Sequence, residues 1–211
     1  MDRSVDSSLS RRAFVGSSLV AAGAVFAGNG ASAWGVEKLN VKSDDWPWWR
    51  GPNRDGVASP NQKPPTKWSD TENVKWKTPV AGRGHGSITV VGEQLFLATA
   101  DTEAASQSVV CLDRATGKSK WSTIVHQGGL DPKGNAKTTH ASSTLACDGE
   151  RLFVNFLNDG AVHTTALSLD GKILWKQRIT DFVIHQGFGS SPAIYDRLVI
   201  VSADNKGMGT G

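Results

Sequence analysis

The chain has little cysteine, little net charge and no long apolar run beyond its first residues. Only two cysteines, Cys111 and Cys147, occur among 211 residues, which excludes a disulfide framework and favours two separate structural thiols. The formal net charge is +3 without a basic run, so nothing favours nucleic-acid binding. No stretch after residue 33 is apolar for long enough to span a bilayer. The hydrophobic content of 38% is that of a globular protein.

The first 33 residues have the layout of an export signal. Arg11 and Arg12 precede an apolar run, and Ala31-Ser32-Ala33 forms a small-residue cleavage site. The order Ser-Arg-Arg-x-Phe is similar to a twin-arginine signal, although Gly16 stands where that signal often has Lys. A buried or membrane helix is the alternative, but the run is short and rich in Gly and Ser. We therefore expect cleavage after Ala33 and a periplasmic or otherwise exported protein.

One hairpin sequence occurs twice. It reads Cys-Leu-Asp-Arg-Ala-Thr-Gly-Lys-Ser-Lys-Trp at Cys111–Trp121 and Ala-Leu-Ser-Leu-Asp-Gly-Lys-Ile-Leu-Trp at Ala166–Trp175. The element Gly-Lys-x-x-Trp recurs at Gly117/Trp121 and Gly171/Trp175, at an offset of 175 − 121 = 54 residues. Both glycines are expected to have positive φ, the second in a two-residue Asp170-Gly171 turn. A single hairpin cannot bury its apolar face, so the repeat indicates stacked units.

Four short β-prone runs are expected in each unit. They are Ser87–Val91, Gln94–Ala100, Ser108–Asp113 and Ser119–Val125 in the first unit, and Ser142–Ala146, Arg151–Asn158, Val162–Ser168 and Lys172–Ile179 in the second. A third unit starts near Gly189, and no segment after residue 33 has sustained helical spacing. A period of about 55 residues predicts an all-β fold, a β-propeller with four-stranded blades. The chain divides into an export signal (1–33), a Trp- and Pro-rich lead-in (34–79) and propeller blades (80–211).

The repeat resembles that of pyrroloquinoline-quinone-like (PQQ-like) β-propellers, whose pattern is Ala-x-Asp-x-x-Thr-Gly-x-x-x-Trp. Ser168 departs from the pattern by replacing the Asp. In that family the Trp and Gly dock neighbouring blades, which implies that Trp121 and Trp175 are largely buried. The order Trp-Pro-x-Trp-Arg-Gly-Pro-x-Arg-x-Gly, from Trp46 to Gly56, is similar to the lead-in of exported bacterial members. Members have seven or eight blades, and seven need roughly 385 residues. The resemblance therefore implies an N-terminal fragment of about two and a half blades.

Two functions are compatible with the resemblance. We expect an exported binding or scaffold module, without a cofactor or catalytic residue, whose loops (notably His126–His140) contact a protein partner or small ligand. The alternative is a PQQ-dependent dehydrogenase, which would use the quinone over Ca²⁺, an Asp base and often two adjacent cysteines. Cys111 and Cys147 are 36 residues apart. The candidate bases all lie in predicted turns, where Asp is common because its side chain hydrogen-bonds the turn backbone: Asp131, Asp159, Asp181 and Asp204. This alternative places its catalytic residues in other blades.

The histidines supply the one metal hypothesis. His85 and His140 each precede the inner strand of a unit, and His185 precedes the third in a looser register. Inner strands line a propeller channel, so these imidazoles could converge on one ion. The opposing interpretation is that each bonds backbone in its own turn.

The aromatic residues of the lead-in also have two interpretations. They could form a stacking platform for a sugar or quinone, or pin the lead-in onto the first unit, and packing is favoured because Trp mainly brings buried area. Asn73–Lys77 resembles the closing strand of a unit without its hairpin, since Trp76 precedes Trp121 by 45 residues.

Replacing Arg11 and Arg12 by Lys is expected to retain the precursor in the cytoplasm, because the twin-arginine receptor reads the pair itself. Cell fractionation measures this. Undiminished export of the double variant would indicate the general secretory route instead.

Overall fold

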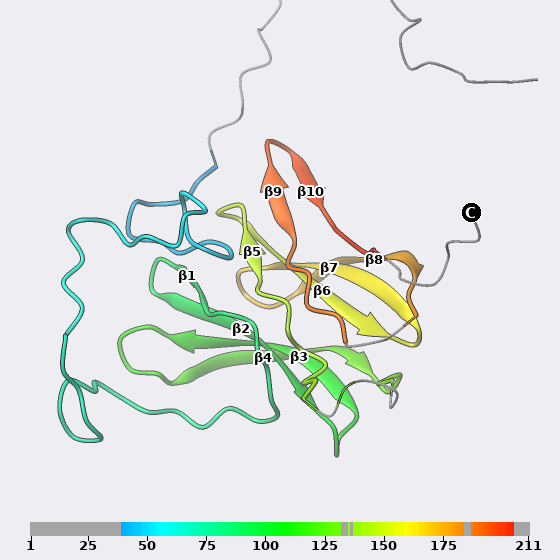
Figure 1. Cartoon of the computed structure of the whole chain (residues 1–211), viewed down its shortest axis with the longest axis horizontal. Helices are drawn as coiled ribbons and strands as arrows, with labels where there is room; N and C mark the ends of the chain where they lie inside the picture. The colour runs from blue at the N-terminus through cyan, green and yellow to red at the C-terminus, as the bar shows by residue number, and fades with distance from the viewer. Residues whose placement is uncertain (1–38, 132–134, 136, 184–186, 205–211) are drawn as a thin grey trace, which may run out of the picture. The chain divides into compact units, whose positions relative to one another are not determined.

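Two four-stranded antiparallel sheets and one two-stranded sheet follow one another along the chain (Figure 1). Unit 1 contains β1 (Thr89–Val91), β2 (Gln94–Asp101), β3 (Ser106–Asp113) and β4 (Ser119–Gln127); unit 2 contains β5 (Ala146–Cys147), β6 (Arg151–Asn158), β7 (Ala161–Ser168) and β8 (Ile173–Asp181); unit 3 contains β9 (Ala193–Tyr195) and β10 (Leu198–Ile200). The computed structural model describes residues 39–131, 135, 137–183 and 187–204, and no helix occurs among them. Sequential strands are neighbours in each described sheet, as in propeller blades. The predicted all-β class is confirmed, and these three sheets do not close into a ring.

The inner strands β1 and β5 are shorter than predicted because their leading residues bond to the neighbouring unit. The Ser87 N–H donates to Thr144 Oγ1 at 2.9 Å, and the Thr144 N–H donates to Ser191 Oγ at 2.9 Å. Thr89 Oγ1 donates to the Leu145 carbonyl at 2.7 Å. Backbone groups that a longer ladder would satisfy are thus paired between units. This links the inner ends of all three units.

The first outer hairpin has the predicted geometry. Asp113 Oδ1 accepts hydrogen bonds from the Thr116 N–H at 2.9 Å and from Thr116 Oγ1 at 2.7 Å. Gly117 has a φ of 71°, and its N–H donates to the Asp113 carbonyl at 2.8 Å. The Asp-x-x-Thr-Gly order therefore closes this turn by itself, because the carboxylate satisfies the turn's own donors.

The second outer hairpin is longer than predicted. Gly171 has the expected positive φ, 89°, but its N–H donates to the Ser168 carbonyl at 3.0 Å. The strands end at Ser168 and resume at Ile173, so the predicted two-residue Asp170-Gly171 turn is wrong. A two-residue turn of that type needs positive φ at both central residues, and Asp170 does not have it. The Ser168 N–H instead donates to the Lys172 carbonyl at 2.9 Å, so Leu169, Asp170 and Gly171 form a three-residue loop.

Trp121 joins unit 1 to unit 2. A Cβ on Gly171 would lie 2.7 Å from Trp121 Cδ2, so only glycine leaves room for the ring. Trp121 Nε1 donates to the Leu169 carbonyl at 3.1 Å, and Thr123 Oγ1 donates to the Gly171 carbonyl at 2.7 Å. The indole is half-buried, and its polar N–H is satisfied at the contact.

Trp76 makes the same contact with unit 1. A Cβ on Gly117 would lie 2.5 Å from Trp76 Cδ2. Trp76 Nε1 donates to the Arg114 carbonyl at 3.1 Å, and Thr78 Oγ1 donates to the Gly117 carbonyl at 2.7 Å. The lead-in therefore occupies the place of an outer strand that precedes unit 1, as the Asn73–Lys77 pattern indicates.

The predicted burial of Trp175 is wrong. Its side chain is 40% exposed and packs against Phe153 of its own sheet, with ring centroids 6.0 Å apart. The earlier tryptophans are covered by the outer hairpin of the following unit, and no such hairpin follows β8 among the described residues. Two residues after each earlier tryptophan stands a threonine, Thr78 or Thr123, whose hydroxyl bonds to the next hairpin. Gln177 occupies this position after Trp175.

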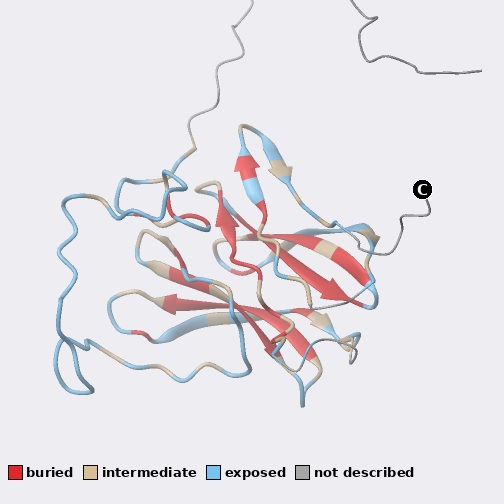
Figure 2. Cartoon of the chain, in the orientation of Figure 1, coloured by how far each residue is buried: buried red, intermediate tan, exposed pale blue. Residues whose placement is uncertain are grey.

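The main core lies between units 1 and 2. It includes Phe96, Val109, Cys111 and Val125 from unit 1 and Cys147, Leu152, Val154, Phe156 and Leu167 from unit 2. Figure 2 shows that burial is concentrated in the middle strands, whereas the long connection of the lead-in is exposed. We call this inter-unit core the seam.

Gly117→Ala tests the tryptophan–glycine contact, with Gly160→Ala as the matched control. Both glycines have similar positive φ values, 71° and 67°, but a Cβ at Gly160 meets nothing within 4 Å. The control is expected to lose about 1 kcal/mol of unfolding free energy from backbone strain. Gly117→Ala is expected to lose about 1–3 kcal/mol more, because Trp76 must move. Urea denaturation measures both, and equal losses would contradict the contact's role.

Candidate functional site

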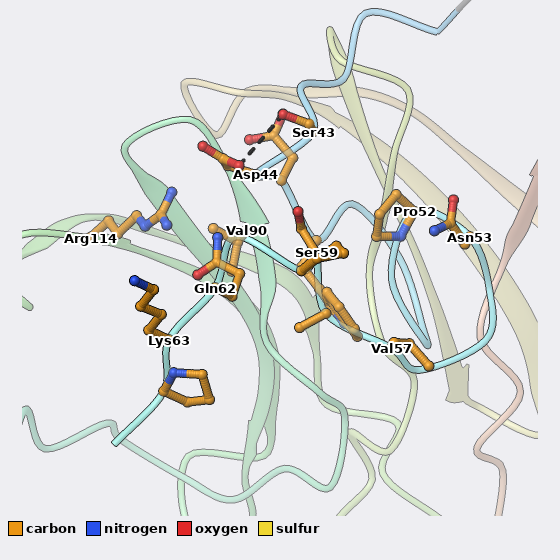
Figure 3. A pocket seen from close by; sticks show the side chains of 15 residues that line it. Ser43, Asp44, Pro52, Asn53, Val57, Ser59, Gln62, Lys63, Val90 and Arg114 are labelled. Atoms are coloured by element: carbon orange, nitrogen blue, oxygen red, sulfur yellow. Dashed lines mark hydrogen bonds between the residues drawn. The ribbon is translucent and has the colours of Figure 1, made fainter. Parts of the chain in front are cut away.

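A pocket of about 600 Å³ lies between the lead-in and unit 1 (Figure 3). We call it the lead-in pocket. Most of its wall comes from the lead-in, and unit 1 contributes only Val90 and Arg114. The lead-in residues are Ser43, Asp44, Asp45, Trp46, Pro52, Asn53, Val57, Ala58, Ser59, Pro60, Gln62, Lys63 and Pro64. Three prolines in this wall restrict the backbone, so the irregular segment has a defined course without secondary structure.

Asp45 and Trp46 attach the lead-in to the first hairpin. The buried Asp45 carboxylate accepts hydrogen bonds from the Lys42 N–H at 2.7 Å and the Gly92 N–H at 2.8 Å. Trp46 and Val90 exchange backbone hydrogen bonds of 2.8 and 2.9 Å. The lead-in thus adds one bridge beside β1, and the pocket opens next to this attachment.

Trp48 packs, as the packing interpretation expects, but the predicted contact with the first unit is wrong for this residue. Its side chain is 7% exposed and lies among Phe153, Ala166 and Ile194. The Arg54 guanidinium covers the ring at 4.8 Å from its centroid and donates to the Ile194 carbonyl. This indole therefore pins the lead-in to units 2 and 3. Trp49 differs, since it is 57% exposed.

The lead-in pocket has a charged rim around apolar walls. Figure 3 shows Lys63 and Arg114 on one side, with Val57 and Pro52 on the other and Asp44 above. Arg114 is held by a hydrogen bond from Nη1 to the Gly92 carbonyl at 3.1 Å. Apolar walls with a few polar groups at the rim are the usual composition of a ligand pocket, where the polar groups fix orientation.

A second pocket, of about 330 Å³, lies where the segments that precede β1, β5 and β9 meet. We call it the axial pocket. It is lined by His85, Asn135, Lys137, Thr138, Ser142, Gly187, Phe188 and Gly189. The predicted binding loop His126–His140 contributes three of these residues, although residues 132–134 and 136 lie outside the described part of the chain.

His85 and His140 have different surroundings in the described part of the chain. His85 lines the axial pocket, whereas His140 does not. His140 has a φ of 57°, and its carbonyl accepts a hydrogen bond from Gln107 Nε2 at 2.8 Å. No cluster of three or more His, Cys, Asp or Glu side chains occurs among the described residues. His185 lies outside them, so the shared-ion hypothesis stays a prediction without support.

The two thiols are buried and unpaired, as the sequence predicts. Cys111 and Cys147 are both free and both belong to the seam. Burial raises the pKa of Cys147 to about 12, and burial likewise raises the pKa of Cys111. Both sulfurs are therefore protonated at neutral pH, which makes them poor nucleophiles and poor metal ligands.

Sequence reasoning missed three sets of residues. The order Trp-x-Thr occurs at both Trp76-Lys77-Thr78 and Trp121-Ser122-Thr123, and this signal could have identified the hydroxyl bond to the next unit. The lead-in pocket left no signal, because its residues have no periodicity. A third group, His126 and His163, meets across the seam from strands that are distant in sequence.

The export residues Arg11, Arg12, Ala31 and Ala33 lie outside the described residues. Within the described part, no helix is long and apolar enough to cross a membrane.

Comparison with known proteins identifies the repeat. No curated protein matches the chain. The family model for outer membrane protein assembly factor BamB matches residues 105–210, from the start of β3 through unit 3, which is half of the chain. This range contains both Gly-Lys-x-x-Trp elements and the Gly171 contact that receives Trp121. The chain therefore belongs to the BamB family of PQQ-like repeat proteins.

Proposed function

We propose that this protein is an exported binding or scaffold module that holds an extended segment of a protein partner beside its lead-in. One observation carries the proposal. Trp76 and Thr78 make the contacts of an outer strand with unit 1, but no strand pairs with this segment among the described residues. We call Asn73–Val80 the docking segment.

The docking segment has the side-chain pattern of a strand. Trp76, Thr78 and Val80 are half-buried, and the residues between them are exposed. Trp76 and Val80 pack against the apolar face of unit 1 formed by Leu95, Val110 and Leu112. Side chains therefore hold the segment extended while its backbone edge is available to a partner strand. Adding a strand to such an edge is a common mode of peptide recognition.

The units themselves indicate which strand fits. In unit 1 the residue opposite Trp121 is Cys111, and in unit 2 the residue opposite Trp175 is Ala166. Both are small and fully buried. A partner strand should therefore place a small residue opposite Trp76, because a larger one would meet the indole. Flanking apolar residues would cover the face of unit 1.

The lead-in pocket adjoins the docking segment through Arg114. This residue lines the pocket, and its carbonyl accepts the Trp76 hydrogen bond. A partner strand beside Trp76 would thus have room for its neighbouring residues in the pocket. Lys63 and Arg114 favour an acidic group at that rim.

The dehydrogenase alternative stays a prediction. PQQ in that family would sit over Ca²⁺, which needs six to eight oxygen ligands, usually with several carboxylates. The described residues do not bring three or more carboxylate, imidazole or thiol groups together. They offer no cage of this kind, and no catalytic step is assigned to them.

A peptide with the sequence of β7, Ala161–Ser168, is expected to bind the chain saturably, because it carries Ala166 for the position opposite a tryptophan. Fluorescence anisotropy of the labelled peptide measures this. The same peptide with N-methylated ladder amides is the control, since it cannot complete the strand hydrogen bonds. Equal binding of both peptides, or binding of neither, would contradict strand addition.

Trp76→Ala is expected to weaken binding of that peptide at least about tenfold, equivalent to 1.4 kcal/mol. Trp68→Ala is the matched control, because Trp68 belongs to the same lead-in but is 69% exposed. A thermal melt of each variant shows whether the fold persists. If both variants bind alike while folded, the docking segment is not the site.

A further inference from the structure

An imidazole pair closes one end of the seam. His126 near the end of β4 contacts His163 of β7, with ring centroids 5.1 Å apart and planes at 61°. The His126 ring also meets Phe156 of β6 edge-on at 6.0 Å. Val125, next to His126, belongs to the seam and is 1% exposed. The pair therefore lies where unit 1 and unit 2 meet.

The buried nitrogen of His126 has no partner. Nε2 is inaccessible to solvent and makes no hydrogen bond with any described residue. A neutral imidazole tolerates this arrangement because one nitrogen can remain an unprotonated acceptor. A protonated ring would bury both an unpaired N–H donor and a charge, which costs far more.

The charged groups around the pair make protonation still less favourable. Lys176 of β8 donates its ammonium hydrogen to the Val125 carbonyl, and its charge lies close enough to act on both rings. Arg178 of β8, the register partner of His163, is paired with Asp181 and also acts on that ring. Asp159, in the turn between β6 and β7, acts on His163 alone. No carboxylate acts on His126 among the described residues.

We propose that the His126–His163 contact is an acid-sensitive latch between unit 1 and unit 2. The latch is closed while both rings are neutral. Protonation of His126 places a cation beside His163 and Lys176 without a counter-charge, and the seam opens so that the ring can reach water. The fold of each sheet persists, because its ladders do not involve the imidazoles.

The direction of the pH dependence follows from the burial of the rings. Burial, followed by the influence of His163 and Lys176, lowers the pKa of His126 from 6.5 to about 4 in the closed state. Burial and then Arg178 also lower the pKa of His163. The open state therefore binds more protons between pH 6.5 and 4. Closure is fully favoured above pH 6.5 and weakens as the pH falls through this window.

The seam thiols provide the test. Cys111 and Cys147 are buried in the seam, so their reaction with 4,4′-dithiodipyridine reports its opening. The rate at each pH is divided by the rate of the denatured chain, because the thiolate fraction itself falls with pH. In the full chain we expect this normalised rate to rise at least about tenfold from pH 7 to pH 4.5. Far-UV circular dichroism should remain unchanged across this range.

Three variants separate the latch from general acid instability. His126→Phe keeps a ring beside Phe156 but cannot titrate, so its normalised rate should stay flat, and His163→Phe should reduce the rise. His85→Phe, at a histidine of the axial pocket, should behave as the parent chain. The proposal is overturned if the parent rate does not rise, if His126→Phe rises equally, or if circular dichroism is lost together with thiol protection. Should His126→Phe fail to fold, an undiminished rise in His163→Phe overturns it.

Discussion

The placement of a tryptophan against the glycine of the following unit is the contact on which the other features depend. A four-stranded sheet with an apolar face leaves that face in contact with water until a neighbouring unit covers it, so packing of one unit on the next is strongly favoured. Trp121 covers Gly171, with its indole N–H and the hydroxyl of Thr123 bonded to backbone carbonyls of the same turn. The contact combines ring burial with satisfied polar groups, and it requires glycine because a Cβ would occupy the place of the indole.

The same contact explains why the lead-in has a defined position without being a strand. Trp76 and Thr78 bond to the first outer hairpin, while Asp45 and Trp46 bond to the inner one. The chain between these attachments runs away from unit 1 before it returns (Figure 1), and its first part forms most of the wall of the lead-in pocket. The proposed binding surface thus lies on a segment that is attached at two places and restricted by prolines between them. Side-chain contacts, rather than strand hydrogen bonds, hold the docking segment extended.

Two kinds of interaction hold unit 1 against unit 2. Most of the seam is apolar and insensitive to pH, with Phe96, Phe156 and the two protonated thiols in its core. One end of the seam contains polar side chains: Gln107 bonds to the carbonyls of His140 and Leu157, and its register partner His126 meets His163. Because His126 Nε2 is buried without a partner, we expect this end to respond to pH more strongly than the apolar centre does.

Local chemistry made much of the fold predictable. The strands β2, β3, β6 and β7 lie within three residues of their expected bounds, since period-two alternation and turn residues act over short distances. Gly117 and Gly171 have the expected positive φ. The prediction for the second outer turn was wrong because a Ser-Leu-Asp-Gly order permits more than one hairpin geometry. Only the register of β7 with β8 selects among them. The predicted burial of Trp175 failed because burial depends on a neighbouring unit rather than on the strand itself.

The sequence by itself determined the all-β class, the repeating unit and the residues that close its outer turns, because each follows from alternation and turn chemistry within a few residues. Only the tertiary structure decided the lead-in pocket and the meeting of His126 with His163. Those features join segments about 40 residues apart, and their geometry is set by how one sheet packs on the next. Such packing leaves no periodic signal in a single sequence.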